Sequence, residues 1–194
     1  MREALKSTAR ATALLVSIPR LTAFYVAAAV IGPERALEGA SQSVSKIAGI
    51  RGQYLRQAFL TRAGVSIHHS ATISFGVLFS KLGAVVEENV YVGPRCHLGL
   101  VHLEKDVLLA AGVHVPSGAH SHGTSDVDQP IRSQARRVDK VRIGAGTWVG
   151  SGAVVMADVG KNCVIGAGAV VTTAIPDNVV AAGVPARVIR QRPE

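Results

Sequence analysis

In the stretch Ile165-Gly166-Ala167-Gly168-Ala169-Val170, an aliphatic residue is followed by small ones. The same pattern of an aliphatic residue followed by glycine recurs at Ile143-Gly144 and Val149-Gly150. From about Val65 to Ala181, an aliphatic residue of this kind recurs at intervals of six. Self-similarity at a short fixed period is typical of repeat architectures, in which identical units stack along one axis. The sequence therefore predicts a parallel β-helix in which three sixes complete one triangular coil.

One aliphatic side chain in each six is expected to fill the narrow interior, with a small residue two positions before it. Gly, Asn or Asp suits the corners, because these residues tolerate tight turns better than most. The 20 glycines and the 4% aromatic content predict a thin prism without room for large rings. We expect about five to six coils, each advancing about 4.8 Å. The predicted inward aliphatics are Ile67, Ile73, Val86, Val92, Leu98, Leu103, Leu109, Val115, Ile143, Val149, Val155, Val159, Ile165 and Val171, and the predicted small neighbours are Val90, Cys96, Val113, Ala119, Ala153 and Ala169.

The repeat stops between Ser121 and Lys140, inside a predicted β-helical domain of residues 65–194. A structureless stretch of this length in a compact domain is usually a functional loop. His120 and His122 flank its start, and Arg132, Arg136, Arg137 and Lys140 lie toward its end. The register predicts that His120 faces outward above His102, and that His97 and His114 form a second column. A neutral imidazole can accept a proton from a hydroxyl group, which makes His120 a candidate general base.

Residues 1–64 lack the six-residue period and are predicted to form a helical segment. The run Ala11 to Ile31 is apolar, but Pro19 and Arg20 lie at its middle. A buried arginine disfavours a membrane span, and it also interrupts the apolar core that a signal peptide needs. We expect one or two helices broken at Pro19, which lie on a membrane, pack on a partner subunit or cover the open end of the coil. Further helices are expected from Pro33 until Gly49 and over Tyr54 to Arg62.

The net charge of +8 and the pI near 10.1 predict an anionic partner. The positive residues are not interleaved with aromatic ones, and no groove-reading motif is present, so nucleic acid is not expected. Phosphate on a small molecule or a lipid surface fits the charge better. Cys96 and Cys163 are interpreted as reduced core residues.

Three segments carry a resemblance to a known family: Ser117-Gly118-Ala119-His120 at the loop, Gly146 to Ser151, and Gly183-Val184-Pro185-Ala186-Arg187 near the end. Together with the repeats, which cover about two thirds of the chain, they resemble the hexapeptide-repeat acyltransferases. This family includes galactoside, maltose, xenobiotic and capsular-polysaccharide O-acetyltransferases. The resemblance implies a left-handed β-helix, a homotrimer with sites between subunits, acetyl-CoA as co-substrate, and no required metal.

The same resemblance implies roles for individual residues. His120 falls on the catalytic base, Trp148 on a wall of the acceptor and pantetheine site, and Ser151 on a backbone donor to the oxyanion. Ala167, Thr172 and Thr173 fall on the pantetheine trench, and Arg187 and Arg190 on contacts to the CoA phosphates. Where the galactoside enzymes place an acceptor-binding asparagine, this chain has Gly93-Pro94-Arg95.

The favoured function is therefore O-acetylation of a sugar hydroxyl, in a glycan or lipid-linked polysaccharide precursor, at the cytoplasmic face of a membrane. Basic and apolar residues of the first helix suit peripheral attachment to an anionic leaflet. Two alternatives stay open. His97 and His102 have the five-residue separation of γ-type carbonic anhydrases, which bind a metal through three histidines, and the chain could also be a non-catalytic β-helical scaffold.

Overall fold

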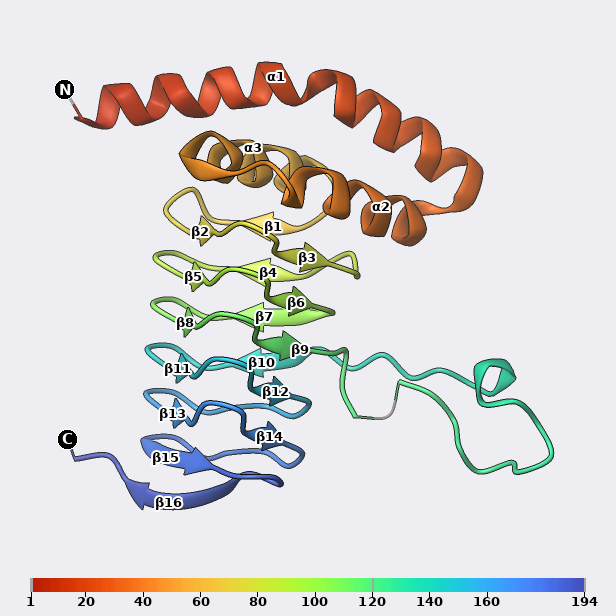
Figure 1. Cartoon of the computed structure of the whole chain (residues 1–194), viewed down its shortest axis with the longest axis vertical. Coiled ribbons are helices and arrows are strands. Elements are labelled where there is room, and N and C mark those ends of the chain that lie inside the picture. The colour runs from red at the N-terminus through yellow and green to blue at the C-terminus, as the bar shows by residue number, and fades with distance from the viewer. Residues whose placement is uncertain (1, 120, 194) are drawn as a thin grey trace.

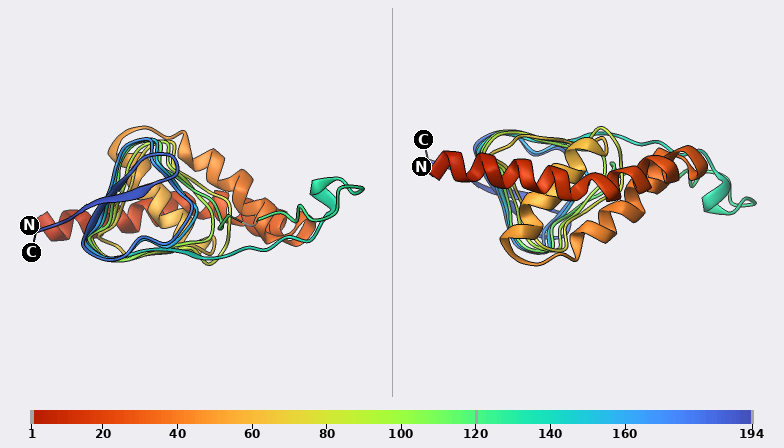
Figure 2. Two further views of the ribbon diagram at one scale, coloured as in Figure 1. Left: turned by 90° about the horizontal axis from the view of Figure 1, so that it is seen from below. Right: turned by 90° about the horizontal axis from the view of Figure 1, so that it is seen from above.

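The computed structural model describes residues 2–119 and 121–193, with side chains from Leu5 onward in the first helix. Three helices lie across one end of a left-handed β-helix of about six coils (Figure 1). Seen along its axis, the coil has a triangular outline, and one long loop extends away from it (Figure 2). The predicted fold class is confirmed.

The three sides of the prism are three sheets, and the chain visits them in the order A, B, C in each coil. Neighbouring strands within the coils pair in parallel, and the last strand returns antiparallel at the edge of sheet B. Sheet A holds β1 (Ser66–Ile67), β4 (Val85–Val86), β7 (Val101–Leu103) and β10 (Val141–Ile143). Sheet B holds β2 (Thr72–Ile73), β5 (Tyr91–Val92), β8 (Leu108–Leu109), β11 (Trp148–Val149), β13 (Val164–Ile165), β15 (Val179–Ala182) and β16 (Arg187–Gln191). Sheet C holds β3 (Leu78–Phe79), β6 (His97–Leu98), β9 (His114–Val115), β12 (Val154–Val155) and β14 (Val170–Val171).

The predicted inward aliphatics are all buried, and none is more than 8% exposed. Corner residues Asn89, Asp106 and Asn162 adopt positive φ angles, as the turn chemistry predicts, and Arg95 does so as well. Cys96 and Cys163 are free and buried, as expected. The six-residue period thus predicts the interior of the coil closely.

Two details of the predicted interior are wrong. Phe79 is only 1% exposed, so the coil does hold an aromatic ring, next to the helices where Ser41 accepts a hydrogen bond from the Phe79 N–H (2.9 Å). Ala119 is exposed, because the chain has already left the coil after Ser117.

The helices are α1 (Arg2–Ile31), α2 (Pro33–Ser45) and α3 (Gly49–Arg62). Pro19 does not break α1, although the helix curves along its length (Figure 1). A proline inside a helix removes one backbone hydrogen bond, and curvature relieves the crowding of its ring. Packing of α1 on the other two helices keeps it continuous. The second helix ends at Ser45 rather than at Gly49, which instead begins α3.

Helices α2 and α3 cover the open end of the coil, a position that was considered for the first helix, and α1 lies over them instead (Figure 1). Arg56 of α3 is 1% exposed and donates hydrogen bonds to the carbonyls of Ile73 (3.1 Å) and Ile47 (2.6 Å). Gln57 donates to the carbonyl of His68 (2.8 Å). Gly52 is required beside this network, because a Cβ there would lie 1.9 Å from the Ile47 oxygen.

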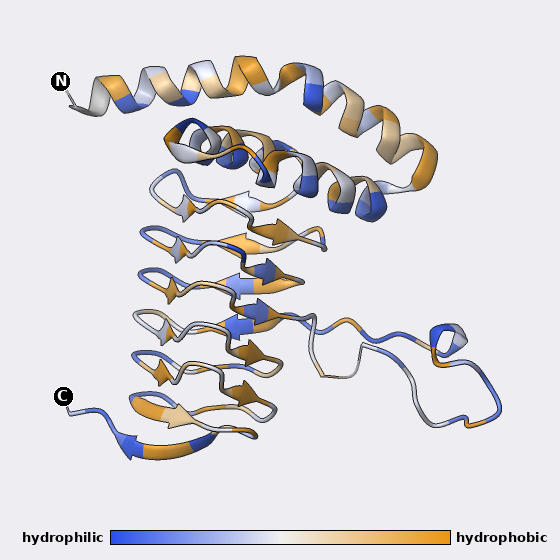
Figure 3. Ribbon diagram, in the orientation of Figure 1, coloured by the Kyte–Doolittle hydropathy of each residue, from blue (hydrophilic) through white to orange (hydrophobic). Residues whose placement is uncertain are grey.

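Helix α1 lies over α2 and α3 and is two-sided. Ala13, Ser17 and Phe24 are buried against the helices beneath, and Phe24 meets the ring of Phe59 edge-on. The helix also exposes many apolar residues, and hydrophobic stretches follow it in Figure 3. These exposed residues are Leu5, Leu15, Val16, Ile18, Tyr25, Val26, Val30 and Ile31. Among the described residues, Leu5–Ile31 is long and apolar enough to cross a membrane by length and composition.

Candidate functional site

The long loop leaves the coil after β9 and returns at β10, at the corner between sheets C and A, which we call the C–A corner. Its two ends are tied together, since the N–H of Asp139 donates to the Ser117 carbonyl (3.0 Å) and that of Gly123 to the Ala135 carbonyl (2.8 Å). The Ser117 hydroxyl is buried and accepts a hydrogen bond from the N–H of Leu100 (2.9 Å). A short 3₁₀ turn, η1 (Ile131–Ser133), lies at the far end.

A cavity of about 190 Å³ opens at the base of this loop. It brings together side chains from sheet C, the C–A corner and both arms of the loop, and we call it the loop-base cavity. Its lining residues are Ser80, Lys81, His97, Gly99, His114, Pro116, Ser117, Ser121, His122, Arg136 and Val138. Sequence reasoning did not single out Lys81, which is held by an ion pair with Glu34 of α2 (2.6 Å). Its position two residues after β3, at the same corner as Gly99, is the signal that could have identified it.

His97 and His114 form the predicted column on sheet C. They are register partners, and their rings stack with centroids 5.0 Å apart and planes 1° apart. The burial around its ring lowers the pKa of His114, and the neighbouring His97 lowers it further. His114 is therefore held in the neutral form that can accept a proton.

His120 lies outside the described residues, so the structure does not test its predicted orientation. Ser117 before it and Ser121 and His122 after it all line the loop-base cavity. The predicted partner of His120, His102, has Val85 and Arg142 as its register neighbours on sheet A. Arg142 lies next to His102 in the following coil because the residues directly after Ser117 form the long loop. Counting residues at a fixed period had assigned them to that coil. His102 itself pairs with Glu87 (2.7 Å).

The predicted cofactor residues near the C-terminus gather on sheet B. Trp148 is 50% exposed, and its outward row continues through Val164 and Val180 to Arg190 on the edge strand β16. Arg187 pairs with Ala182 on the same edge. Directly paired residues of antiparallel strands face the same side, so both arginines project from the outer face that carries Trp148. Three strand spacings, about 14 Å, separate Trp148 from Arg190.

Ser151 and Ala167 lie at the next corner, between sheets B and C, in adjacent coils. The N–H of Gly168 donates to the Ser151 carbonyl (2.9 Å), and a Cβ on Gly150 would lie 2.5 Å from the Ala167 nitrogen. Small residues therefore make a shallow, closely packed corner. The backbone N–H of Ser151 has no hydrogen-bond partner in the described part of the chain, so it can donate to a ligand.

Thr172 and Thr173 lie elsewhere, at the C–A corner. They come directly after β14, just as Pro116 and Ser117 come directly after β9. Because β14 and β9 are two strands apart in sheet C, the two pairs of residues are separated by about 10 Å along the coil axis. The structure thus brings the candidate residues together as two groups. The first group consists of the residues that line the loop-base cavity, together with Thr172 and Thr173. The second group consists of Trp148, Ser151, Ala167, Arg187 and Arg190.

The two groups cannot meet within one chain. In a triangular prism, sheet B is the side opposite the C–A corner, and buried aliphatic side chains fill the space between them. The loop extends away from the triangular outline instead of folding back over sheet B (Figure 2).

Comparisons with known proteins agree with the repeat. Residues 140–173 match the family described as bacterial transferase hexapeptide (six repeats), and residues 83–116 match the hexapeptide repeat of succinyl-transferase. A galactoside O-acetyltransferase of Escherichia coli is 57% identical over 144 residues, covering 59% of this chain and 66% of the relative. A putative lipopolysaccharide biosynthesis O-acetyl transferase of the same organism is 27% identical over 161 residues, covering 71% and 81%.

Solved structures share the fold. A maltose O-acetyltransferase from Clostridium difficile superposes with a TM-score of 0.62 at 22% identity, covering 83% of this chain and 89% of that one. An N-acyltransferase from Bacillus cereus, solved with coenzyme A and dTDP-4-amino-4,6-dideoxyglucose, gives a TM-score of 0.58 at 15% identity, covering 69% and 76%.

The repeats, the coil and these relatives place the chain in one class: it belongs to the hexapeptide-repeat acyltransferases. Two other curated relatives are matched over only 24% and 54% of their own length.

Proposed function

We propose that the protein is an acetyl-CoA-dependent O-acetyltransferase that acts on a sugar hydroxyl. The observation that carries this proposal is the loop-base cavity, where the loop that contains His120 leaves the coil beside a stacked histidine pair. Related enzymes named as sugar O-acetyltransferases, and a structural neighbour solved with coenzyme A, support the same activity.

In the proposed reaction, His120 accepts the proton of the acceptor hydroxyl as its oxygen attacks the thioester carbonyl carbon. The backbone N–H of Ser151 donates to the oxyanion, and the C–S bond then breaks to release the CoA thiol, which takes up the proton from the imidazolium. General-base assistance of this kind contributes about 10²–10⁴-fold, and an oxyanion donor contributes about 10²–10³-fold.

We further propose that the enzyme is a homotrimer with each site shared between two subunits. The C–A corner of one copy would meet sheet B of the next, because one chain cannot join its own two groups. Exposed apolar residues on both surfaces support such packing. Tyr91, Leu108 and Trp148 form one outward row on sheet B, while Val127 and Ile131 are exposed on the loop.

The acceptor is proposed to be a glycan or lipid-linked precursor, reached from the cytoplasmic face of a membrane. The outer side of α1 supports peripheral attachment, since Leu15, Val26 and Val30 are each more than 60% exposed and recur near helical spacing. Val26→Glu should reduce binding to phospholipid vesicles. The matched control, Ile189→Glu on the exposed edge strand β16, should leave vesicle binding unchanged, and equal loss in both variants would refute attachment through α1.

The central test of acyl transfer is His120→Ala. We expect kcat to fall by about 10²-fold or more with little change in CoA binding, because the base acts on the acceptor hydroxyl. His102→Ala, which removes a histidine paired with Glu87, serves as the control and should be milder. Normal turnover in His120→Ala would end the proposed mechanism.

Neither alternative function gains support from the structure. His97 and His102 lie on sheets C and A, so within one chain their side chains lie on different sides of the coil. The described residues hold no group of three side chains of metal-ligand type. A non-catalytic scaffold would leave the loop-base cavity and its histidines without a role.

A further inference from the structure

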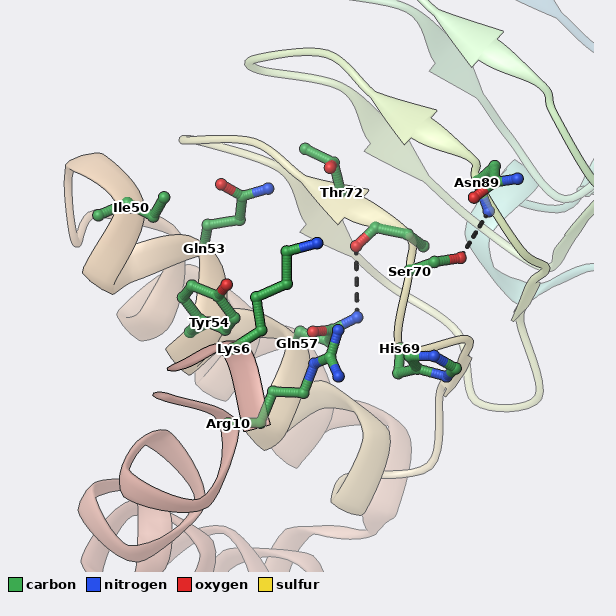
Figure 4. Close-up of a pocket in the computed structure, with 11 residues that line it drawn as sticks. Lys6, Arg10, Ile50, Gln53, Tyr54, Gln57, His69, Ser70, Thr72 and Asn89 are labelled. Carbon is green, nitrogen blue, oxygen red and sulfur yellow. Dashed lines mark hydrogen bonds between the residues drawn. The ribbon is translucent and has the colours of Figure 1, made fainter. Parts of the chain in front are cut away.

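A second cavity lies between α1, α3 and the first coils, at the corner between sheets A and B, whereas the loop-base cavity lies at the C–A corner. It measures about 410 Å³, and polar side chains reach into it from three elements (Figure 4). We call it the helix-end pocket. Its lining residues are Lys6 and Arg10 from α1, Ile50, Gln53, Tyr54 and Gln57 from α3, and His69, Ser70, Ala71, Thr72 and Asn89 from the coil.

The charge of the helix-end pocket is positive. Lys6 and Arg10 are four residues apart and therefore share one face of α1. In Figure 4, Lys6 extends toward Thr72 and Ser70, and Arg10 extends toward Gln57 and His69. None of the described lining residues is acidic. The described lining therefore places two cationic side chains, and no carboxylate, around one cavity.

Arg10 gives a second, independent indication. Its Nε is buried and has no hydrogen-bond partner in the described part of the structure. A buried donor without an acceptor destabilises the folded protein. A guanidinium that is shielded from water on one side also attracts an anion more strongly on the other. The Arg10 Nε–H can therefore donate to an acceptor on a ligand, because no described residue of the chain accepts from it.

Hydrogen bonds within the protein hold the lining residues of the helix-end pocket in place without a ligand. The Gln57 amide donates to the carbonyls of His68 (2.8 Å) and Ala71 (3.3 Å), and the Ser70 hydroxyl accepts from the N–H of Asn89 (2.8 Å). Preformed walls lower the conformational entropy that binding would cost.

We propose that the helix-end pocket binds a phosphate group, with Arg10 and Lys6 as its cationic donors. Phosphate suits this site because its oxygens can accept from a guanidinium fork and from an ammonium at the same time. A phosphorylated lipid headgroup and a soluble phosphate compound share this chemistry. The inference does not depend on acyl transfer, because no residue of the helix-end pocket belongs to the proposed active site.

The surroundings of the pocket favour a lipid as the source of the phosphate. An apolar groove of about 670 Å³ lies along α1 and shares Ile50 and Tyr54 with the helix-end pocket. Leu5, Ala13 and Val16 line it from α1. A headgroup in the pocket would therefore have an apolar surface for its chain within reach.

The test uses the full-length protein, with inorganic phosphate as the first probe. Phosphate should raise the melting temperature of the wild type relative to chloride at matched ionic strength, because a ligand that binds only the folded state stabilises it. Arg10→Gln and Lys6→Gln should each weaken phosphate binding by about ten-fold or more, as expected when a charge-assisted hydrogen bond is lost. Arg10→Lys, which keeps the charge but loses the fork, should fall in between.

Arg35→Gln is the matched control, because it removes the same charge from an exposed site on α2 outside the pocket. No phosphate-dependent shift in the wild type, or equal loss in Arg35→Gln and Arg10→Gln, would overturn the proposal. Melting curves without phosphate exclude misfolding as the cause of lost binding.

Vesicles identify the source of the phosphate. Phosphatidylcholine vesicles are compared with and without phosphatidic acid. If Arg10→Gln loses phosphatidic acid binding and phosphate binding together, the ligand is a lipid headgroup. If only phosphate binding falls, the ligand is soluble, and the phosphate site stands. If every pocket variant binds vesicles as the wild type does, and free phosphate does not bind, the proposed phosphate site is wrong.

Discussion

Replacing Arg56 with Met tests how the helices are fixed to the coil. Arg56 is almost wholly buried, and burial lowers the pKa of its guanidinium. It forms no ion pair within the described residues. Its partners are backbone carbonyls, chiefly those of Ile47 and Ile73. One side chain thus links α3, the turn after α2, and the first coil.

The expected cost follows from these two carbonyls. Met has a similar apolar stem but no donor, so both oxygens lose their partner in a buried setting. Each unsatisfied group costs about 1–3 kcal/mol, and removing a buried charge offsets part of that, which leaves a net loss of about 2–4 kcal/mol. For a chain of this size, 1 kcal/mol shifts the melting temperature by about 2–4 °C. We therefore expect a fall of about 10 °C.

Thermal unfolding at fixed protein concentration, followed by circular dichroism, measures this loss. Arg62→Met is the matched control, because it makes the same substitution at an exposed site in the same helix. It should shift the melting temperature by less than about 2 °C, which is usual for a surface change. If Arg56→Met unfolds within about 2 °C of this control, the buried arginine does not anchor the helices as argued.

Three further predictions concern the coil and its candidate site. Arg187→Ala combined with Arg190→Ala should raise the KM for acetyl-CoA by about ten-fold and make binding less sensitive to salt, as steady-state kinetics would show, whereas an unchanged KM would leave both as solvated charges. The lowered pKa of His114 means that the unfolded chain takes up a proton first as the pH falls below about 6.5. Unfolding free energy should therefore decrease on acidification from pH 7, and this decrease should be smaller in His114→Gln, while equal slopes would contradict the assignment. Burial raises the pKa of Cys96 to about 11, so its thiol should resist a thiol reagent at pH 8 until the protein unfolds, and rapid labelling of the folded protein would contradict this.

The coil could be predicted because one physical requirement repeats in every six residues. Most inward positions hold an aliphatic side chain, such as Val86, Val92 and Leu98, and these residues recur at the predicted interval. Phe79 escaped the prediction because the width of the coil was inferred from overall aromatic content. That average does not describe the first coils, which pack against α2.

The helical segment was harder to predict because tertiary contacts override local signals there. Pro19 would end an isolated helix, yet α1 continues through it, with Ala13 buried before the proline and Phe24 buried after it. Arg56 carried no motif at all. Its role depends on carbonyls of Ile47 and Ile73, which only the folded arrangement brings together.

The candidate site was predictable only where register alone decides position. The stacking of His97 on His114 followed from counting residues along the coil. The same counting placed His120 above His102, but Arg142 holds that position because the loop intervenes. The separation of the candidate residues into two groups could not be predicted, because the six-residue period does not show which of the three sheets each repeat belongs to.

Activity of mixed trimers tests the central claim, a shared acyltransfer site, most directly. His120→Ala removes the base from one group, and Ala167→Trp fills the corner proposed for the pantetheine arm in the other. Each variant alone should be inactive. Trimers that contain both kinds of chain, isolated through two different affinity tags, should each regain one of three sites and show about one third of wild-type activity. Mixed trimers without activity would mean that both residues serve a site within one chain, and would contradict the account.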